Sequence, residues 1–167
     1  MHHRFACPIL LLLGSITIAG CGGGLPSTAT VSGKVTYQGN PVPGASVILT
    51  RGSGDIGKGE IAVGKTDANG RFELTTHFAG QSAAKGAVPG SYKVTVSKAV
   101  PPEGMTQEQY QQLVDNAKKA GETGAMVPID QQPPPTTEMF PEHASREKTP
   151  LTAEIKPGKN DLDLAIK

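Results

Sequence analysis

Aromatic residues are scarce in this chain, and tryptophan is absent. Four Phe and three Tyr make up 4% of the 167 residues, which leaves few rings for an exposed surface that stacks on sugars or unpaired bases. The formal net charge is only +1, and no cluster of Lys or Arg is present. Because proteins that bind nucleic acid carry a basic footprint, we expect no nucleic-acid partner.

Residue patterns that build catalytic or metal sites are also missing. Beyond the first 20 residues the only histidines are His77 and His143, whereas a closed zinc site needs about four ligands at suitable spacing. The segment Asp67–Gly70 starts like a calcium loop but lacks the distal Glu, so it favours a hairpin turn. No Gly-x-Ser-x-Gly motif occurs. We expect no cofactor, no metal and no enzymatic activity.

Only one long apolar run is present, and it lies near the N-terminus. Met1–Arg4 is basic, Phe5–Ile18 is mostly apolar, and small residues follow. This order is typical of a secretory signal peptide, and the run is shorter than the roughly 20 residues that a transmembrane helix needs. We therefore predict that residues 1–20 form an export signal.

The residues at the end of this segment are Ile18, Ala19, Gly20 and Cys21. They resemble the bacterial lipobox, in which an aliphatic residue and two small residues precede a cysteine. The resemblance implies cleavage before Cys21 and attachment of lipid to it, so that the membrane of the bacterial cell envelope becomes a partner. Two or more acyl chains suffice for stable anchoring. An ordinary signal peptide with a nearby cysteine is the alternative.

A flexible tether is expected over residues 21–30. Gly22–Gly24 cannot hold a regular element cheaply, and about nine flexible residues span roughly 15–18 Å. Some bacteria use an aspartate after the lipidated cysteine to retain lipoproteins in the inner membrane. Because Gly22 stands there instead, the resemblance implies the outer membrane, at its periplasmic or surface face. Cys7 falls in the export signal, so Cys21 has no disulfide partner in the mature chain.

Residues 31–167 contain seven short segments in which apolar and polar side chains alternate with a period of two. This alternation is typical of strands with one buried face. The residues expected on the buried face are Val31, Gly33, Val35 and Tyr37; Ala45, Val47 and Leu49; Ile61 and Val63; Phe72 and Leu74; Tyr92, Val94 and Val96; Leu151, Ala153 and Ile155; and Leu162, Leu164 and Ile166. Turn residues such as Asn69-Gly70 separate the segments. The pattern predicts an all-β fold, an antiparallel β-sandwich around a single core.

Four motifs in this region carry a further resemblance. They are Val31–Val35, Pro43–Val47, Thr66–Phe72 and Pro89–Val94. In this order they resemble the carboxypeptidase regulatory-like, or transthyretin-like, domain family, whose fold is a seven-stranded Greek-key sandwich. That family has no single activity, and its domains accompany peptidases, adhesins and transport receptors. Transthyretin-like hydrolases end in Tyr-Arg-Gly-Ser, a tail that this chain lacks, so the resemblance implies no hydrolase activity.

An insertion of about residues 99–150 precedes the last two strands. It contains a predicted helix, Thr106–Ala120, with a Thr106/Gln109 capping box and Gly121 as its stop. We expect this helix to pack on the sandwich through Tyr110, Leu113, Val114 and Ala117. Residues 131–137 are proline-rich and extended, either as a connector or as a ligand for a proline-recognising partner. Met139 and Phe140 are expected to return to the core.

These features favour a non-catalytic module of the bacterial envelope with a binding, adapter or structural role. Its partner would be an envelope protein. The alternative is a carbohydrate-binding module at the cell surface, with a glycan as ligand. Tyr37, Phe72 and Tyr92 fall on the buried face of their strands, which leaves few rings for sugar binding.

Overall fold

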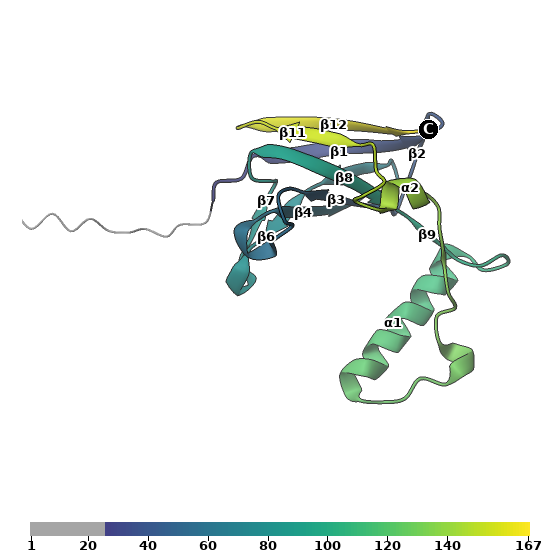
Figure 1. The fold of residues 1–167 in the computed structure, drawn as a ribbon. Helices are drawn as coiled ribbons and strands as arrows, with labels where there is room; N and C mark the ends of the chain where they lie inside the picture. Colours follow the sequence, from purple (N-terminus) through teal and green to yellow (C-terminus); the bar gives the residue numbers. More distant parts are fainter. Residues whose placement is uncertain (1–25) are drawn as a thin grey trace, which may run out of the picture.

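The structure is a computed structural model that describes residues 26–167, apart from the side chain at position 81. The chain forms mostly β-strands, with two α-helices and three short 3₁₀ helices (Figure 1). The strands are β1 (Thr30–Tyr37), β2 (Asn40–Pro41), β3 (Ser46–Thr50), β4 (Ile61–Lys65), β5 (Arg71–Glu73), β6 (Thr75–His77), β7 (Ala83–Lys85), β8 (Gly90–Ser97), β9 (Ala99–Val100), β10 (Thr137–Glu138), β11 (Thr152–Ile155) and β12 (Lys159–Ile166). The helices are η1 (Ile56–Lys58), η2 (Ala79–Gln81), α1 (Gln107–Thr123), η3 (Ile129–Gln131) and α2 (Pro141–Ala144).

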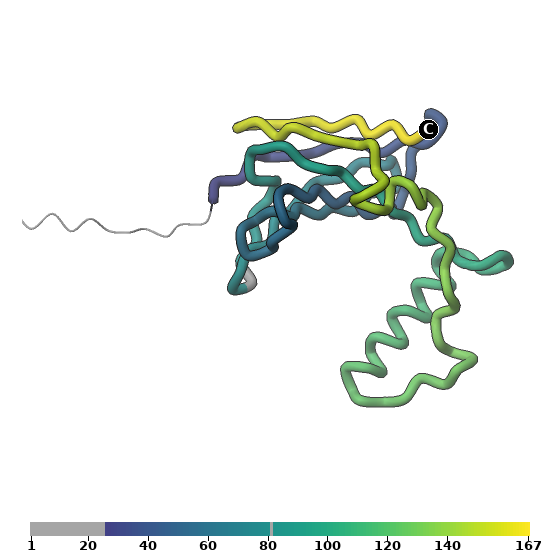
Figure 2. Tube along the Cα trace, in the orientation of Figure 1, coloured from purple at the N-terminus to yellow at the C-terminus, as the bar shows by residue number. Residues whose placement is uncertain are grey.

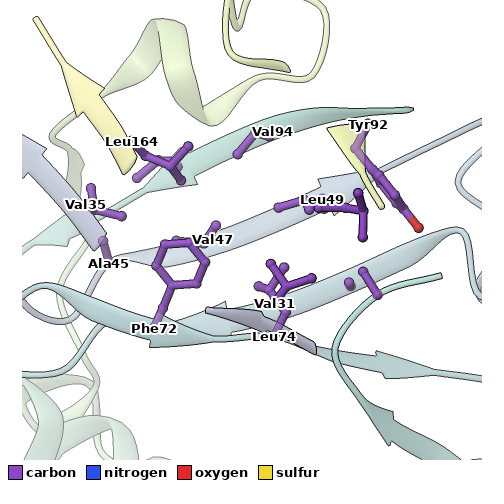
Figure 3. Packing of buried hydrophobic residues seen from close by; sticks show 14 of the residues in the cluster. Val31, Val35, Ala45, Val47, Leu49, Phe72, Leu74, Tyr92, Val94 and Leu164 are labelled. Atoms are coloured by element: carbon purple, nitrogen blue, oxygen red, sulfur yellow. The ribbon is translucent and has the colours of Figure 1, made fainter. Parts of the chain in front are cut away.

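The strands form two main sheets. One has the order β12-β1-β2, with β5 also paired to β1, and the other has the order β11-β8-β3-β4-β6-β7. The inward side chains of both sheets belong to a single apolar cluster (Figure 3). The expected all-β architecture is therefore confirmed, with the core between the two sheets.

Strand alternation places most of the expected residues in this core. Val35, Val47, Leu49, Val94 and Val96 are completely buried. Burial of such a side chain stabilises the fold by about 1.5–3 kcal/mol relative to its exposure. Other residues expected inside that are also buried are Val31, Ala45, Phe72, Leu74, Tyr92, Ile155, Leu164 and Ile166.

The prediction for the third strand is wrong. Ile61 and Val63 are only partly buried, and Ala62 between them is completely buried. Strand β4 pairs with β3 so that Ala62 lies opposite Leu49, and opposite residues of paired strands point to the same face. Because Ile61, Ala62 and Val63 are all apolar, the sequence alone does not reveal whether the odd- or the even-numbered residues of this strand face the core.

The expectation of purely antiparallel sheets fails for one pair of strands. β1 and β12 run parallel over their full length, from Thr30 opposite Lys159 to Tyr37 opposite Ile166. A parallel pair requires a long connection between its strands. Nearly the whole domain separates these two strands, so that connection is available. Every other pair of named strands is antiparallel within the described range 26–167.

The strand count also exceeds the expected seven. Each predicted segment contains a strand, and the described residues add five short ones, which are β2, β6, β7, β9 and β10. The fourth predicted segment continues into a second sheet, because β5 pairs with β1 whereas β6 pairs with β4. Between them the Leu74 amide donates to the Val31 carbonyl at 3.0 Å. Leu74 is thus the point where the chain passes from one sheet to the other.

Helix α1 begins as the sequence predicts and ends later. Thr106 and Gln109 form the expected capping box. The helix continues through Gly121 to Thr123 and stops at Gly124, which has a φ of 69°. Gly121 was expected to be the stop, but the left-handed conformation that favours glycine at a helix end occurs at Gly124.

The prediction that α1 packs on the sandwich is wrong. The helix projects away from the sheets and has no buried residue (Figures 1 and 2). Its apolar stripe, with Tyr110, Leu113, Val114 and Ala117, is only partly buried. The side of the helix that looks toward the sandwich carries Gln, Glu and Asp instead. An amphipathic pattern shows that a helix has an apolar face, but not which neighbour covers it.

Gly33 lies at the closest backbone approach in β1. A Cβ atom there would lie 2.3 Å from the Leu162 carbonyl oxygen and 2.6 Å from a carbon of the Phe72 ring. Strand β1 pairs with both β12 and β5 at this position. A side chain at residue 33 would therefore push the neighbouring strand or the ring out of place.

We predict that Gly33→Ala lowers the free energy of unfolding by about 1–3 kcal/mol, because the added methyl group overpacks the core. The matched control is Gly121→Ala inside α1, where a Cβ atom has nothing within 4 Å. That variant should be more stable by about 0.5–1 kcal/mol, since alanine is the better helix former. Urea unfolding of the two variants measures both effects. If the two substitutions change the free energy of unfolding equally, close packing around Gly33 does not limit the side chain at that position.

Candidate functional site

The residues of the predicted lipidation site lie outside the described part of the chain. This applies to Cys21 and to the lipobox residues Ile18, Ala19 and Gly20. The described chain starts at Pro26 and joins the sandwich where Ala29 and Ala87 exchange two backbone hydrogen bonds of 2.8 and 2.9 Å. Among residues 26–167 there is no helix with the length and apolar character needed to span a membrane.

The insertion leaves and re-enters the sandwich at one point. Strands β9 and β10 pair there, with Val100 opposite Thr137. The Glu138 carboxylate accepts hydrogen bonds from the backbone amides of Lys98 at 2.8 Å and Phe140 at 3.0 Å. Residues 101–136 therefore form an excursion, which we call the α1 excursion, closed at its base by backbone and side-chain hydrogen bonds.

Phe140 anchors the chain after the excursion. Its side chain is buried in the core, and its ring centroid lies 5.3 Å from that of Tyr37. Offset or tilted aromatic pairs of this kind stabilise by about 0.5–1.5 kcal/mol beyond their area burial. The expected return to the core is confirmed for Phe140 but is wrong for Met139, which is 41% exposed.

A groove separates helix α1 from the sandwich. It has a volume of about 580 Å³. The sandwich side is formed by the turn at Pro43 and Gly44 and by Lys65, Lys98 and Ala99. The helix side is formed by Gln107, Glu108, Gln111, Gln112 and Asp115. Amide and charged groups can exchange hydrogen bonds with a polar ligand or with a segment of a partner protein.

Exposed large apolar side chains concentrate in and beside the α1 excursion. Met126 and Ile129 are 95% and 88% exposed. Val100 and Met139, at the base of the excursion, are also exposed. Elsewhere in the described residues the only exposed large apolar side chain is Ile56, in η1. Exposed apolar side chains of this size are available to pack against another protein.

Exposed aromatic rings are absent from the described range. Phe72, Phe78, Tyr92 and Phe140 are buried, and Tyr37 and Tyr110 are partly buried. Phe78, for which the sequence gives no strand position, lies so close under Gly59 that a Cβ atom there would be 2.3 Å from its ring. The described surface therefore offers no aromatic platform of the kind on which sugars stack.

The residues considered for metal binding are not brought together. His77 is exposed on β6, and His143 is partly buried in α2. Residues 26–167 contain no group of three or more His, Cys, Asp or Glu that could hold a metal ion. At Asp67 the chain makes a tight turn, in which the carboxylate accepts from the amides of Asn69 at 2.8 Å and Arg71 at 2.9 Å. The expected hairpin is wrong, because β4 pairs with β3 and β6 whereas β5 pairs with β1 in the other sheet.

The glycine-rich loop between β3 and β4 is organised by one carboxylate. Glu60 Oε2 accepts from the Asp55 amide at 2.9 Å and from the Ser53 hydroxyl at 3.0 Å. The hydrogen bond from the Asp55 amide and that from Ser53 lower the pKa of Glu60, because they stabilise its ionised form. Sequence reasoning missed this role, since Glu60 has no acidic or basic neighbour that singles it out.

We predict that the order of this loop depends on pH through Glu60. Because the folded-state pKa is lowered, the hydrogen bonds are present above the ordinary value of 4.5 and are lost as pH falls through the lower folded value. The amide chemical shift of Asp55 should follow that titration in NMR spectra. Glu60→Gln should abolish the transition, whereas Glu73→Gln on strand β5 should preserve it. A transition that survives Glu60→Gln would assign it to another group.

Comparison with known proteins gives no relative for this chain. No protein-family model, curated protein or solved structure matches it. The resemblance to carboxypeptidase regulatory-like domains accordingly rests on the four sequence motifs and stays a prediction.

Proposed function

We propose that this chain is a lipid-anchored, non-catalytic module of the bacterial envelope that binds a protein partner through its α1 excursion. The anchor is the lipid on Cys21, and the absence of an aspartate after it favours the outer membrane. The partner is an envelope protein that presents an apolar surface. This proposal combines the lipobox motif of the sequence with the surface of the described domain.

The observation that carries the proposal is the uneven distribution of exposed apolar side chains. Val100, Met126, Ile129 and Met139 all lie in the excursion or at its base. Met126 and Ile129 follow a projecting helix and contribute nothing to the core, so core packing gives no reason for their apolar character. Contact with a partner supplies one, because burying such side chains is the main driving force of protein association.

The arrangement of the domain suits an anchored adapter. The described chain enters the sandwich at one end, near Ala29, and β9 leads into the excursion at the other end (Figure 1). A tether of about nine residues reaches roughly 15–18 Å, which keeps the first end close to the bilayer. The base of the excursion then lies farther from the bilayer and accessible to other envelope proteins.

The finer fold assignment belongs to the same proposal. We assign the sandwich to the seven-stranded Greek-key, transthyretin-like type, with the short strands as additions. The Tyr92 hydroxyl supports this, because it donates to the Val88 carbonyl four residues upstream at 2.6 Å. Such a tyrosine corner is typical of Greek-key sandwiches. The alternative function, a carbohydrate-binding module, has less support because the described aromatic rings are buried or partly buried.

We predict that Cys21→Ser abolishes lipidation and moves the protein out of the membrane fraction. A serine cannot form the thioether, and the described domain offers no membrane-spanning helix to replace the anchor. Fractionation after a carbonate wash, together with incorporation of labelled fatty acid, measures both effects. A mutant that stays with the membrane, and a parent protein that takes up no fatty acid, would refute the anchor.

We predict that the double substitution Met126→Ser and Ile129→Ser lowers partner binding at least tenfold, which corresponds to about 1.4 kcal/mol. Its melting temperature should not change, since both side chains are outside the core. Crosslinking in native envelopes, followed by quantification of the crosslinked species, measures the effect. The matched control is Ile56→Ser, which removes an exposed apolar side chain from a different part of the domain.

A deletion tests the whole excursion. Val100 and Thr137 are opposite each other in an antiparallel pair, so an Asn-Gly turn can replace residues 101–136 and keep β9 and β10 joined. This shortened protein should fold and lose the crosslinked partner. If it retains that partner at full yield, binding occurs elsewhere on the sandwich.

A further inference from the structure

Three cationic residues line a pocket beside the six-stranded sheet. The pocket has a volume of about 460 Å³. Its walls come from the end of β3, the start of β8, strand β11 and the loop after α2. The cations are Arg51, Lys93 and Arg146, and the carboxylate among the lining residues is that of the exposed Glu154.

The backbone of Arg51 is hydrogen-bonded at both its amide and its carbonyl, but part of its guanidinium lacks a partner. Its amide donates to the Glu60 carbonyl at 2.9 Å, and its carbonyl accepts from Gly54 at 2.9 Å. Its side chain passes over Gly90, where a Cβ atom would lie 3.4 Å from Nη1. Its Nε atom is buried and has no hydrogen-bond partner. A buried donor without an acceptor is costly, so removing it should not destabilise the unliganded domain.

The other two cations are oriented by carbonyl groups and not neutralised. Arg146 Nη2 donates to the Gly52 carbonyl, and Lys93 Nζ donates to the Thr149 carbonyl at 3.3 Å. Within residues 26–167 the only ion pair joins Lys58 to Asp55, at 3.5 Å. Asp55 and Glu60 are the acidic residues nearest to Arg51 in the sequence. The Glu60 carboxylate accepts hydrogen bonds from Ser53 and Asp55 and so holds the loop.

We propose that this pocket binds the phosphate group of an anionic ligand. Like charges repel each other, and the three cations of this pocket outnumber its one lining carboxylate, Glu154, so an anion between them is attracted. A carboxylate is planar and is satisfied by a single guanidinium fork. Two guanidinium groups and an ammonium group from three separate segments suit a tetrahedral group, which presents acceptor oxygens in several directions.

Two sources share this chemistry: the headgroup of an anionic phospholipid and a soluble phosphate ester. The pocket is built entirely from described residues of the sandwich. The proposal therefore does not depend on the partner-binding role of the α1 excursion. Lipid anchoring affects only which of the two sources is nearer.

The test uses the full-length chain in a neutral detergent, titrated with inorganic phosphate and pyrophosphate at low ionic strength. Saturable binding that weakens with added salt is expected. Arg51→Met and Arg146→Gln should each lower the affinity about tenfold or more, because each removes charge-assisted hydrogen bonds. Arg71→Gln, an exposed arginine on β5, is the matched control and should leave the affinity unchanged.

Stability without ligand separates a binding role from a structural one. Arg51→Met keeps an apolar stem over Gly90 and removes the unpartnered donor, so the unliganded protein should melt at the same temperature or higher. The rise in melting temperature that phosphate causes in the parent protein should disappear. If Arg51→Met destabilises the unliganded protein and Arg146→Gln binds phosphate as tightly as the parent, the pocket is structural and the proposal is wrong.

Vesicles distinguish the two sources. The protein is reconstituted in phosphatidylcholine alone and in equal parts of phosphatidylcholine and phosphatidylglycerol, and hydrogen exchange is followed at Gly52 and Ser53. If amide exchange at these residues slows in the vesicles that contain phosphatidylglycerol, without added phosphate, the ligand is a lipid headgroup. Slower exchange only after phosphate is added identifies a soluble ligand. Exchange that is unaffected in both arms, together with the absence of saturable phosphate binding, would overturn the proposal.

Discussion

Strand β1 pairs with three segments that lie far apart in the sequence, and the sandwich depends on those pairings. It pairs with β2 directly after it, with β5 in the middle of the chain and with β12 at the end. Gly33 permits this, because its lack of a side chain leaves room for the Phe72 ring and the Leu162 carbonyl. With β1 fixed, Val31 and Val35 point inward, and the facing sheet completes the core.

The two proposed binding features lie where the chain departs from this regular frame. The α1 excursion begins and ends at the β9–β10 pair, and Glu138 and Phe140 secure its return. The cationic pocket forms where the loop after β3 meets the segment after α2. Both features are therefore attached to sheet strands, while Met126, Ile129 and the three cationic residues are not part of the core. That combination is common for binding sites, which need fixed geometry and an accessible surface.

Local sequence patterns predicted the strands well, because alternation and turn residues act over a few positions. Val47 and Leu49 alternate with less buried neighbours, and Asp67 forms its turn within four residues. The prediction that Ile61 and Val63 face the core was wrong, because apolar residues occupy both the inward and the outward positions of that strand. The cationic pocket was invisible in the sequence, since Arg51 and Arg146 are 95 positions apart and only tertiary packing brings them together. Which part of the molecule covers the apolar face of helix α1 is likewise decided by tertiary packing, not by the local sequence.

The pairing of β1 with β12 also governs when the domain can finish folding. Asn160 donates to the Thr30 carbonyl across 130 positions of sequence, and contacts of such long range slow folding because the intervening loop must close first. A ribosome releases the chain from its N-terminus onward, so β1 emerges long before its parallel partner β12 is synthesised. Such a delay fits the proposed export signal, because a chain that has not completed its fold can be passed through a membrane unfolded.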